Sequence, residues 1–485
     1  MSPGSLSVLS VSCMVALTFS TPASGQTSGH IPNPADARTL NVTDPPKALR
    51  ALEFELAFRP FDQIEGDASA QWYQACILHG NNAARGSLVT DWLAKEPSEF
   101  DQDAAWAAVS GFIHDVYPVL LVAAKRDQCD WGTPIRTNSI GTLLPELATL
   151  RDIGRSLALK ARIELLNNDF AAAAETLTIG LELACDLGRS PTLIQGLVGL
   201  AVGSIICEQL ERWVQTPAAP SLYWPLSRLE NPLVSLRRAY TYESSMLDFT
   251  FPDLKRLQSG GLSPEAAAAL SADLFSNLQS IDAGDVPNSP TDPLGAAASA
   301  AANFPAARAY LISQGVTPAE IDALPVPFVT LRWQLESFQK HSDEVFKWSA
   351  LPYAEIEPAL LNTAAATAAE LRAAQDSQPM LVILPAINNS FVSSVLLERR
   401  IALLRAVEAL RLHATTHNSF PQSLAEVTDI PVPNDPVTGL PFEYRLDTAA
   451  AVLSGRAPKL AGHQGGFERR LIRTRAGSEA EPPKK

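Results

Sequence analysis

Apolar residues between Leu143 and Cys207 recur at steps of three and four, which is the spacing of an amphipathic helix. Two successive stripes share this spacing, the first with Leu147, Leu150, Gly154, Leu157, Ala161 and Leu165, and the second with Phe170, Ala173, Leu177, Gly180, Leu181 and Ala184. The residues between the stripes, Asn167 to Asp169, favour turns and helix caps. Because this connection is so short, the pattern predicts two antiparallel helices.

A third helix is predicted from Pro191 to Cys207, a segment without charged residues in which Gly196, Gly199 and Gly203 share one face. Such a segment either crosses a membrane or packs closely inside a protein core. It is short for a span, which needs about 20 apolar residues, and amphipathic helices precede it. We therefore expect a buried core helix.

Helical spacing continues over most of the chain, whereas strand-like alternation is almost absent before residue 430. A helix is expected from Lys47 through Leu49, Leu52 and Leu56, ending at Pro60. Further helices are predicted near 68–79, 82–95, 101–125, 232–248, 264–282, 304–314, 318–323, 329–348, 353–374 and 392–416. The predicted fold is mainly all-α, built of stacked antiparallel helical hairpins, with a small C-terminal helix plus β-hairpin element.

The N-terminus has the pattern of an export signal. Leu6 to Phe19 is apolar, and Ala23 and Gly25 are small residues suited to cleavage after Gly25, although Lys and Arg are missing before the apolar stretch. Export to the periplasm or another extracytoplasmic compartment is expected, with no transmembrane span after cleavage. The alternatives are a cytoplasmic protein, if this segment is no signal, or a lipoprotein at Cys13, which Ser10 disfavours.

The predicted organisation follows from these patterns and from the Pro-rich breaks between them. It comprises a signal peptide at 1–25, a linker at 26–46, a helical-hairpin domain at 47–282, a Pro/Ala-rich linker at 283–303, a helical region at 304–417, a small turn and strand element at 418–456, and a disordered basic tail at 457–485.

The net charge of −14 argues against nucleic-acid binding, which requires a basic face. Only the C-terminal end is basic, with Arg469, Arg470, Arg473, Arg475, Lys484 and Lys485. We interpret it as a solvated, disordered end, with weak contact to an anionic surface as the alternative.

Removal of the signal with Cys13 leaves Cys76, Cys129, Cys185 and Cys207. Cys185 and Cys207 end successive helices and would lie at opposite ends of an antiparallel pair, so the disulfide to test is Cys76 with Cys129. The spacings match no zinc site, and buried free thiols are the simpler interpretation.

Motifs for nucleophilic catalysis or phosphate binding are missing from the sequence, which contains neither G-x-S-x-G nor G-x-x-x-x-G-K-[ST]. His413 and His417 share a helix face and are compatible with a two-imidazole metal clamp completed by Glu426 or Asp429; a role at the helix C-terminus is favoured. Two further acidic groups are interpreted as a helix start and a solvated face, namely Asp101 with Asp103 and His341 with Asp343 and Glu344. The sequence thus predicts no catalytic, cofactor-binding or metal-binding residue and no cofactor.

The hairpin through Asn168-Asp169-Phe170 resembles one tetratricopeptide unit of about 34 residues. It departs from that pattern because its first helix lacks the usual aromatic and Cys185 stands in place of the closing proline. The resemblance implies tetratricopeptide-like packing of this hairpin.

The C-terminal segment carries a second resemblance. A helix through Val395, Ala402 and Leu410 stops at Asn418, and Pro431 to Gly439 leads to the alternating strand Phe442 to Arg445. This order resembles the C-terminal region of the type II secretion major pseudopilin. Pseudopilins begin with a membrane helix that runs straight into this region, whereas here the helix lies deep inside the chain, so only the local shape is expected to correspond.

Taken whole, the chain is similar to a family of exported helical proteins of planctomycete bacteria without an established activity. The similarity rests on Cys129-Asp130-Trp131-Gly132, Leu144 to Gly154, Pro191 to Gly199 and Asn434 to Gly439. It implies an exported helical fold and no activity.

The function expected from the sequence is that of an exported, non-enzymatic scaffold whose helical grooves bind a protein or peptide partner. One alternative is a hydrolase or lyase of the cell envelope on an α-helical scaffold, which would require a deep cleft with paired carboxylates. The other is a structural component of the envelope, anchored by the basic tail.

Overall fold

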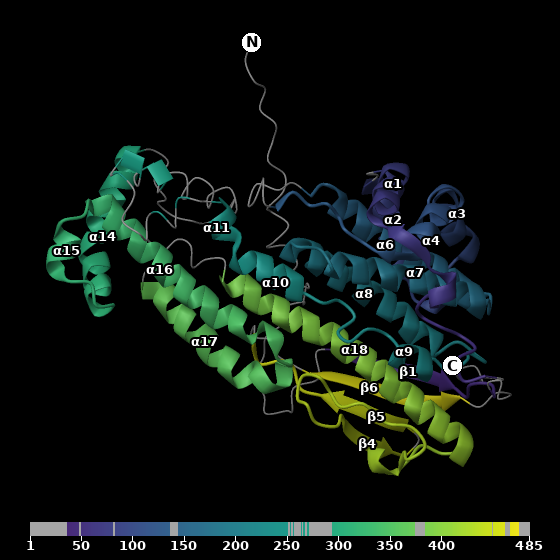
Figure 1. Ribbon diagram of the computed structural model, residues 1–485. Coiled ribbons are helices and arrows are strands. Elements are labelled where there is room, and N and C mark those ends of the chain that lie inside the picture. The colour runs from purple at the N-terminus through teal and green to yellow at the C-terminus, as the bar shows by residue number, and fades with distance from the viewer. Residues whose placement is uncertain are drawn as a thin grey trace.

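The computed structural model describes residues 36–47, 50–80, 83–135, 144–250, 293–373, 384–448, 450–460 and 466–474, with isolated positions between 253 and 270. Most of these residues are helical, and a small sheet lies against the C-terminal helix (Figure 1). The prediction of a mainly helical chain with a small C-terminal strand element is therefore confirmed.

Three long helices form the centre of the protein: α6 (Glu146–Leu166), α7 (Phe170–Gly188) and α8 (Leu193–Trp213). The predicted hairpin is present, and the apolar stripe of α6 is buried from Leu147 to Leu165. Asn168 takes a left-handed conformation at the turn (φ 56°), and the Asp169 side chain accepts a hydrogen bond from the backbone N–H of Ala172 at 3.1 Å. Turn and cap chemistry thus fix where α6 ends and α7 begins.

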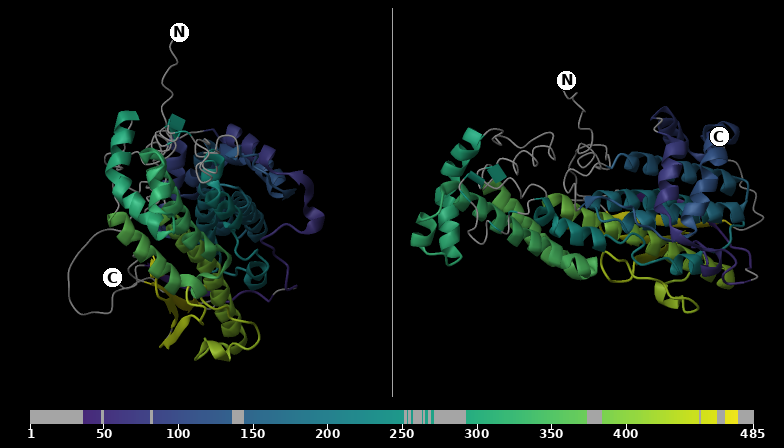
Figure 2. Two further views of the ribbon diagram at one scale, coloured as in Figure 1. Left: turned by 60° about the vertical axis from the view of Figure 1, so that its left-hand side comes forward. Right: turned by 45° about the horizontal axis from the view of Figure 1, so that its top comes forward.

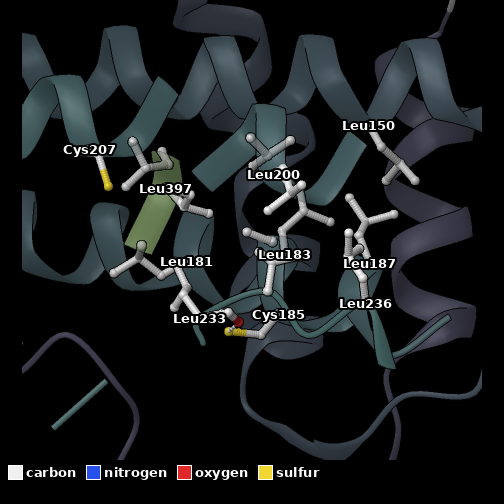
Figure 3. Packing of buried hydrophobic residues seen from close by; sticks show 14 of the residues in the cluster. Leu150, Leu181, Leu183, Cys185, Leu187, Leu200, Cys207, Leu233, Leu236 and Leu397 are labelled. Carbon is white, nitrogen blue, oxygen red and sulfur yellow. Dashed lines mark hydrogen bonds between the residues drawn. The ribbon is translucent and has the colours of Figure 1, made fainter. Parts of the chain in front are cut away.

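Helix α8 lies in the core, where its apolar side chains meet α6, α7 and the C-terminal helix (Figure 3). It is long and apolar enough to cross a membrane, but most of its apolar stretch is buried inside the protein. Gly199 packs so closely on α7 that an added Cβ would lie 2.8 Å from the backbone oxygen of Ala184. The small residues on this face therefore serve helix packing.

Four shorter helices pack around α6 and α7: α1 (Ser69–His79), α2 (Ala83–Ala94), α3 (Gln102–Asp115) and α4 (Tyr117–Ala124). The single helix predicted over 101–125 is wrong, because the chain bends by 60° between α3 and α4. Pro118 lies at the start of α4, where the backbone N–H that proline lacks would not take part in a helical hydrogen bond. Strands β2 (Ile64–Asp67) and β3 (Arg126–Gln128) pair in parallel next to these helices.

The helix predicted from Lys47 to Pro60 is also wrong. Residues 50–59 form turns and irregular backbone, and a short 3₁₀ helix follows at Pro60–Asp62. Leu56 is buried nevertheless, while Leu52 is 40 % exposed. Leu52 and Leu56 thus matched a helical spacing without sharing one buried face, and Leu49 lies outside the described residues.

Three short helices connect the centre to the second half of the chain: α9 (Tyr223–Ser227), α10 (Arg237–Ser244) and α11 (Met246–Thr250). Helix α9 interrupts the Pro-rich stretch 217–232, and α10 and α11 replace the single helix predicted over 232–248. Nearly all of the helix predicted over 264–282 lies outside the described residues.

A helical arm projects from the centre and contains α14 (Pro293–Ser313), α15 (Pro318–Asp322), α16 (Val326–Phe346) and α17 (Tyr353–Ala373) (Figures 1 and 2). Helix α14 begins inside the linker predicted over 283–303, because its start is rich in alanine, the residue with the highest helix propensity. A capping box between Thr317 and Glu320 starts α15. Further 3₁₀ helices lie at Pro97–Glu99, Lys347–Ala350 and Leu424–Glu426.

The C-terminal unit consists of the long helix α18 (Leu384–His417) and a four-stranded sheet in the order β1-β6-β5-β4. Its strands are β1 (Asp36–Thr43), β4 (Glu443–Asp447), β5 (Ala450–Gly455) and β6 (Phe467–Thr474). Strand β1 pairs in parallel with β6, and the other pairs are antiparallel. Ala406 and Leu410 of α18 pack in one core with Leu453 and Leu471 of the sheet.

Two predicted boundaries are overturned by this sheet. Residues 36–43 of the supposed linker 26–46 form β1, and residues 467–474 of the supposed disordered tail 457–485 form β6. In β6, Phe467, Arg469 and Leu471 alternate as buried residues with less buried neighbours. The alternation was not recognisable in the sequence because an arginine occupies one of the buried positions. Arg469 can be buried there because it pairs with Asp36 and Glu211.

The turn chemistry predicted for this unit is confirmed. Asn418 ends α18 in a left-handed conformation (φ 59°). Gly439 has a φ of 70°, and its backbone N–H donates to the Asp435 carbonyl at 2.8 Å. The Asp435 carboxylate accepts two hydrogen bonds from the Arg399 guanidinium, at 2.8 and 2.7 Å, with both side chains buried. An ion pair thus holds the turn against α18.

Candidate functional site

A trough of about 250 Å³ lies along α18. One wall is formed by residues 226–233, the other by Pro433, Asn434 and Pro436, and the floor includes Ile401 and Ala402 of α18. Helix α9 and α18 lie side by side at this point (Figure 1). The trough is therefore bounded by one long helix and two connecting segments.

The first wall runs antiparallel to α18. The Ser221 hydroxyl donates to Glu408 at 2.8 Å, Arg405 donates to Ser227 at 3.0 Å, and the hydroxyls of Tyr240 and Ser390 are 2.8 Å apart. The segment from Ser221 to Tyr240 and helix α18 therefore run in opposite directions. Residues 230–233 consequently lie next to the turn of α18 that carries Glu398.

The second wall also runs antiparallel to α18. The Tyr223 hydroxyl donates to the carbonyl of Pro431 near the Arg405 end, and Asp435 is paired with Arg399 near the Glu398 end. Side-chain contacts therefore anchor both walls to the same helix, which defines two ends of the trough.

At one end, Arg405 is fixed in position. Its Nε donates to the Ser227 Oγ at 3.0 Å, and its guanidinium carbon is 5.9 Å from the centre of the Tyr223 ring. Ser227 is held in turn by donating to the Tyr223 carbonyl at 2.7 Å. The position of Nε is thereby set, while the two terminal nitrogens have no ion-pair partner in the part of the chain that the structure describes.

At the other end, Glu398 accepts one hydrogen bond, from the Ser394 hydroxyl at 3.4 Å. Burial raises the pKa of the Glu398 carboxyl above its ordinary value. Glu230 lines the same end but forms an ion pair with Arg189 at 2.8 Å. The Glu398 carboxyl thus lacks a cationic partner among the described residues.

Glu398 and Arg405 cannot neutralise each other. They lie two turns apart on one face of α18, about 10.5 Å along the axis at about 1.5 Å per residue. The other arginines of α18 all have carboxylate partners: Arg399 pairs with Asp435, Arg400 with Glu208 and Arg411 with Glu408. The trough therefore presents an acidic end and a basic end separated by an apolar floor, which suits a ligand with two opposite charges.

No model of a known family, no curated protein and no solved structure matches the chain. The resemblances to the tetratricopeptide unit, to the pseudopilin and to the planctomycete family accordingly stay predictions.

A second cavity, of about 260 Å³, lies between residues 50–62 and α7. Most of its charged groups are already engaged, since Arg59 pairs with Asp62, Glu55 with Arg228, and Glu175 accepts from the Tyr117 hydroxyl. This cavity offers fewer free groups to a ligand than the trough does.

The most deeply buried acidic group of the helical centre is Asp186. Its carboxylate accepts from the Trp72 indole at 2.8 Å and from Arg189 at 2.9 Å, and its backbone carbonyl accepts from the Trp131 indole at 2.8 Å. Burial raises the pKa of Asp186 to about 6, and burial likewise raises the pKa of Glu182, one turn earlier, to about 7. These contacts join α1 and the Trp131 segment to α7, which indicates a structural role.

The Asp186→Asn variant is expected to show a flatter dependence of stability on pH. Between about pH 4 and pH 6 the folded protein keeps the Asp186 proton and the unfolded chain loses it, so the unfolding free energy falls as pH rises. A pKa of about 6, against an ordinary value of 3.8 for this side chain, corresponds to about 3 kcal/mol lost across this window. Urea unfolding from pH 4 to pH 7 measures it. The exposed control Asp91→Asn should keep the wild-type slope, and an Asp186→Asn slope equal to wild type would contradict the prediction.

The residues considered as metal ligands lie at the end of α18. The rings of His413 and His417 stack with centroids 4.1 Å apart, and the His417 Nδ1 is 3.2 Å from the His413 carbonyl oxygen. Burial and the charge of His417 lower the pKa of His413. Glu426 accepts from the backbone N–H of Gln422 at 2.8 Å. Within the described ranges, no group of three or more His, Cys, Asp or Glu is arranged to hold a metal ion.

The remaining acidic candidates are located on helices. Asp101 caps α3 by accepting from the Ala104 N–H at 3.1 Å, and Asp103 lies in the first turn, as predicted for a helix start. On α16, His341 contacts the Ser337 carbonyl at 2.7 Å, while Glu344 pairs with Lys347. These contacts are local to each helix.

All four described cysteines are free thiols. Cys76 and Cys129 therefore do not form the disulfide that their spacing allowed. Burial raises the pKa of both thiols, and the next contribution for Cys129 is the charge of Asp186. A structural place beside the buried acid accounts for Cys129 better than a crosslink does.

Sequence reasoning missed Arg405 and Glu398. Their spacing places unlike charges on the same helix face as Ile401 and Ala402, which was a detectable signal. The lack of a partner for each charge was not detectable, because the neighbouring carboxylates and arginines come from distant segments.

Proposed function

We propose that this chain is an exported, non-enzymatic helical scaffold that binds a peptide segment of a partner in the trough on α18. The observation that carries the proposal is a pair of opposite charges, Glu398 and Arg405, which line the two ends of the trough and have no ion-pair partner among the described residues. A side chain that is half-buried, charged and without an ion pair costs solvation energy, which a charged ligand would recover.

Rigid positioning supports the proposal. Both charged residues lie on one helix whose C-terminal half is packed on the sheet, and both walls are anchored to that helix by hydrogen bonds, the first through Ser221 and Glu408 and the second through Asp435 and Arg399. A preorganised site loses little entropy when a ligand binds. Extended grooves between stacked helices are also the usual binding surfaces of helical-hairpin proteins.

The finer parts of the proposal rest on the sequence. Tetratricopeptide-like stacking is supported by the mutual packing of α6, α7 and α8. Export is supported by the apolar stretch Leu6 to Phe19 with the small residues Ala23 and Gly25 after it.

Binding is favoured over hydrolysis by the state of the two carboxylates in the trough. Glu398 and Glu230 both line it, and paired carboxylates are the usual equipment of a glycoside hydrolase. Glu230, however, is ion-paired with Arg189, and the floor between the walls is apolar. These features suit a peptide side chain better than a sugar ring and an attacking water.

Methyl NMR of the full chain with a pool of short unmodified peptides tests the proposed function. The Ile401 methyl signal is expected to shift because Ile401 lies on the trough floor, whereas that of Ile77, exposed on α1, should stay in place. The peptides should be recovered intact by mass spectrometry. An unmoved Ile401 signal would contradict peptide binding in the trough, and cleaved peptides would contradict the non-enzymatic role.

A further inference from the structure

We infer that the trough recognises the free C-terminal end of an extended peptide, with the terminal carboxylate at Arg405 and a positive group at Glu398. This inference rests on the proposed function and specifies its ligand. It also gives the direction in which the ligand lies along α18.

The carboxylate position follows from the geometry of Arg405. Its Nε is occupied by Ser227 at 3.0 Å, so the two terminal nitrogens form the available edge of the guanidinium. Such an edge binds a carboxylate through two parallel hydrogen bonds. The cation–π interaction with the Tyr223 ring favours one orientation of the guanidinium, which suits this bidentate arrangement.

The position of the positive group follows from the opposite end. Glu398 lacks a cationic partner among the described residues, whereas Glu230, the other carboxylate at this end, is already paired with Arg189. A cation at this end would stabilise the ionised form of the buried Glu398 carboxyl. In a short peptide the N-terminal ammonium supplies this cation.

The length of the ligand follows from the spacing of the two charges. The backbone positions of Glu398 and Arg405 are about 10.5 Å apart along the helix axis, and an extended chain advances about 3.3 to 3.6 Å per residue. Three residues therefore span the trough. The apolar floor at Ile401 and Ala402, with Leu226 and Leu233 in the wall, suits a small apolar side chain in the middle.

Calorimetry with three tripeptides tests the inference: trialanine, its C-terminal amide and its N-acetyl form. Trialanine is expected to bind the full chain. The amide should bind at least about tenfold more weakly, because it loses the charge-assisted pair with Arg405, and the acetyl form should also bind more weakly.

Variants assign each preference to its residue. Arg405→Gln should bind trialanine and the amide equally, and Glu398→Gln should lose the preference over the acetyl form. Arg405→Lys keeps the positive charge but lacks the two parallel N–H donors of the guanidinium. It should retain part of the preference for the free carboxylate. The exposed Arg237→Gln, on α10, is the matched control and should behave as wild type. Melting curves confirm that each variant is folded.

The outcomes separate this inference from the proposed function. Equal binding of trialanine and its amide by the wild type would overturn the inference and leave peptide binding intact. Failure of trialanine to bind, while the peptide pool still shifts the Ile401 methyl, would overturn only the inference. A preference for the free carboxylate that survives in Arg405→Gln would overturn the assignment of Arg405.

Discussion

Replacement of Gly199 by leucine is expected to unfold the protein or to lower its melting temperature strongly. A Cβ at this position would lie 2.8 Å from the Ala184 carbonyl oxygen and 3.0 Å from the Leu187 Cβ, and 3.3 Å from the backbone nitrogen of Gly188. Overpacking of a core usually costs about 1–3 kcal/mol, and the cost should be higher here because backbone atoms cannot rotate away. Helices α7 and α8 would have to separate at the centre of the core.

Circular dichroism during thermal unfolding measures this effect. Gly111→Leu is the matched control, because Gly111 is an exposed helical glycine with no atom within 4 Å of an added Cβ. That substitution should be neutral or stabilising, since glycine costs about 1 kcal/mol in a helix interior. Equal melting temperatures for Gly199→Leu and the wild type would show that α7 and α8 do not pack as described.

Arg399→Met is expected to destabilise the protein by about 3–5 kcal/mol, because it leaves the Asp435 carboxylate buried and without its ion-pair partner. Both members of this pair are almost completely buried, at 5 % and 2 % exposure. Asp435 also accepts from the Val437 N–H at 2.9 Å, so the turn that covers the end of the trough should loosen with it. Chemical denaturation with a fluorescence readout gives the unfolding free energy.

The double variant Arg399→Met with Asp435→Asn separates lost pairing from lost packing. It should recover part of the stability, because no uncompensated charge is buried. Arg308→Met is the surface control, since Arg308 forms a bidentate pair with Asp322 at an exposed position and should leave stability nearly unchanged. A loss in Arg399→Met no larger than in this control would argue against a buried ion pair.

Local chemistry was predicted well from the sequence where it acts over a few residues. The turn at Asn167 to Asp169, the stop at Asn418 and the turn at Asp435 to Gly439 each depend on neighbours in the chain, and each is present in the structure. The helical stripes of α6 and α7 were recognisable for the same reason. Periodicity alone was misleading between Lys47 and Pro60, where no helix forms, and over 101–125, where it gave no sign of the bend between α3 and α4.

Long-range pairing was invisible to the same reasoning. Arg469 was interpreted as part of a solvated tail because burial of an arginine depends on carboxylates that lie far away in the chain. The trough was missed on the same physical grounds, since its two walls and α18 come from three separate segments. A single sequence shows which charges exist, whereas only the fold shows which of them stay unpaired.

The pairing of β1 with β6 has a consequence for the order of assembly. Arg469 in β6 donates to the carbonyl of Asp36 in β1 across 433 residues of chain. Closure of so long a loop carries an entropic cost that local hairpins avoid, so contacts of this kind form late unless other structure first brings the ends together. We therefore expect the helices between them to fold before β1 pairs with β6. The pairing of β1 with β6 would then be a late step of folding. A chain truncated before residue 467 would lack β6 and leave β1 without its partner strand.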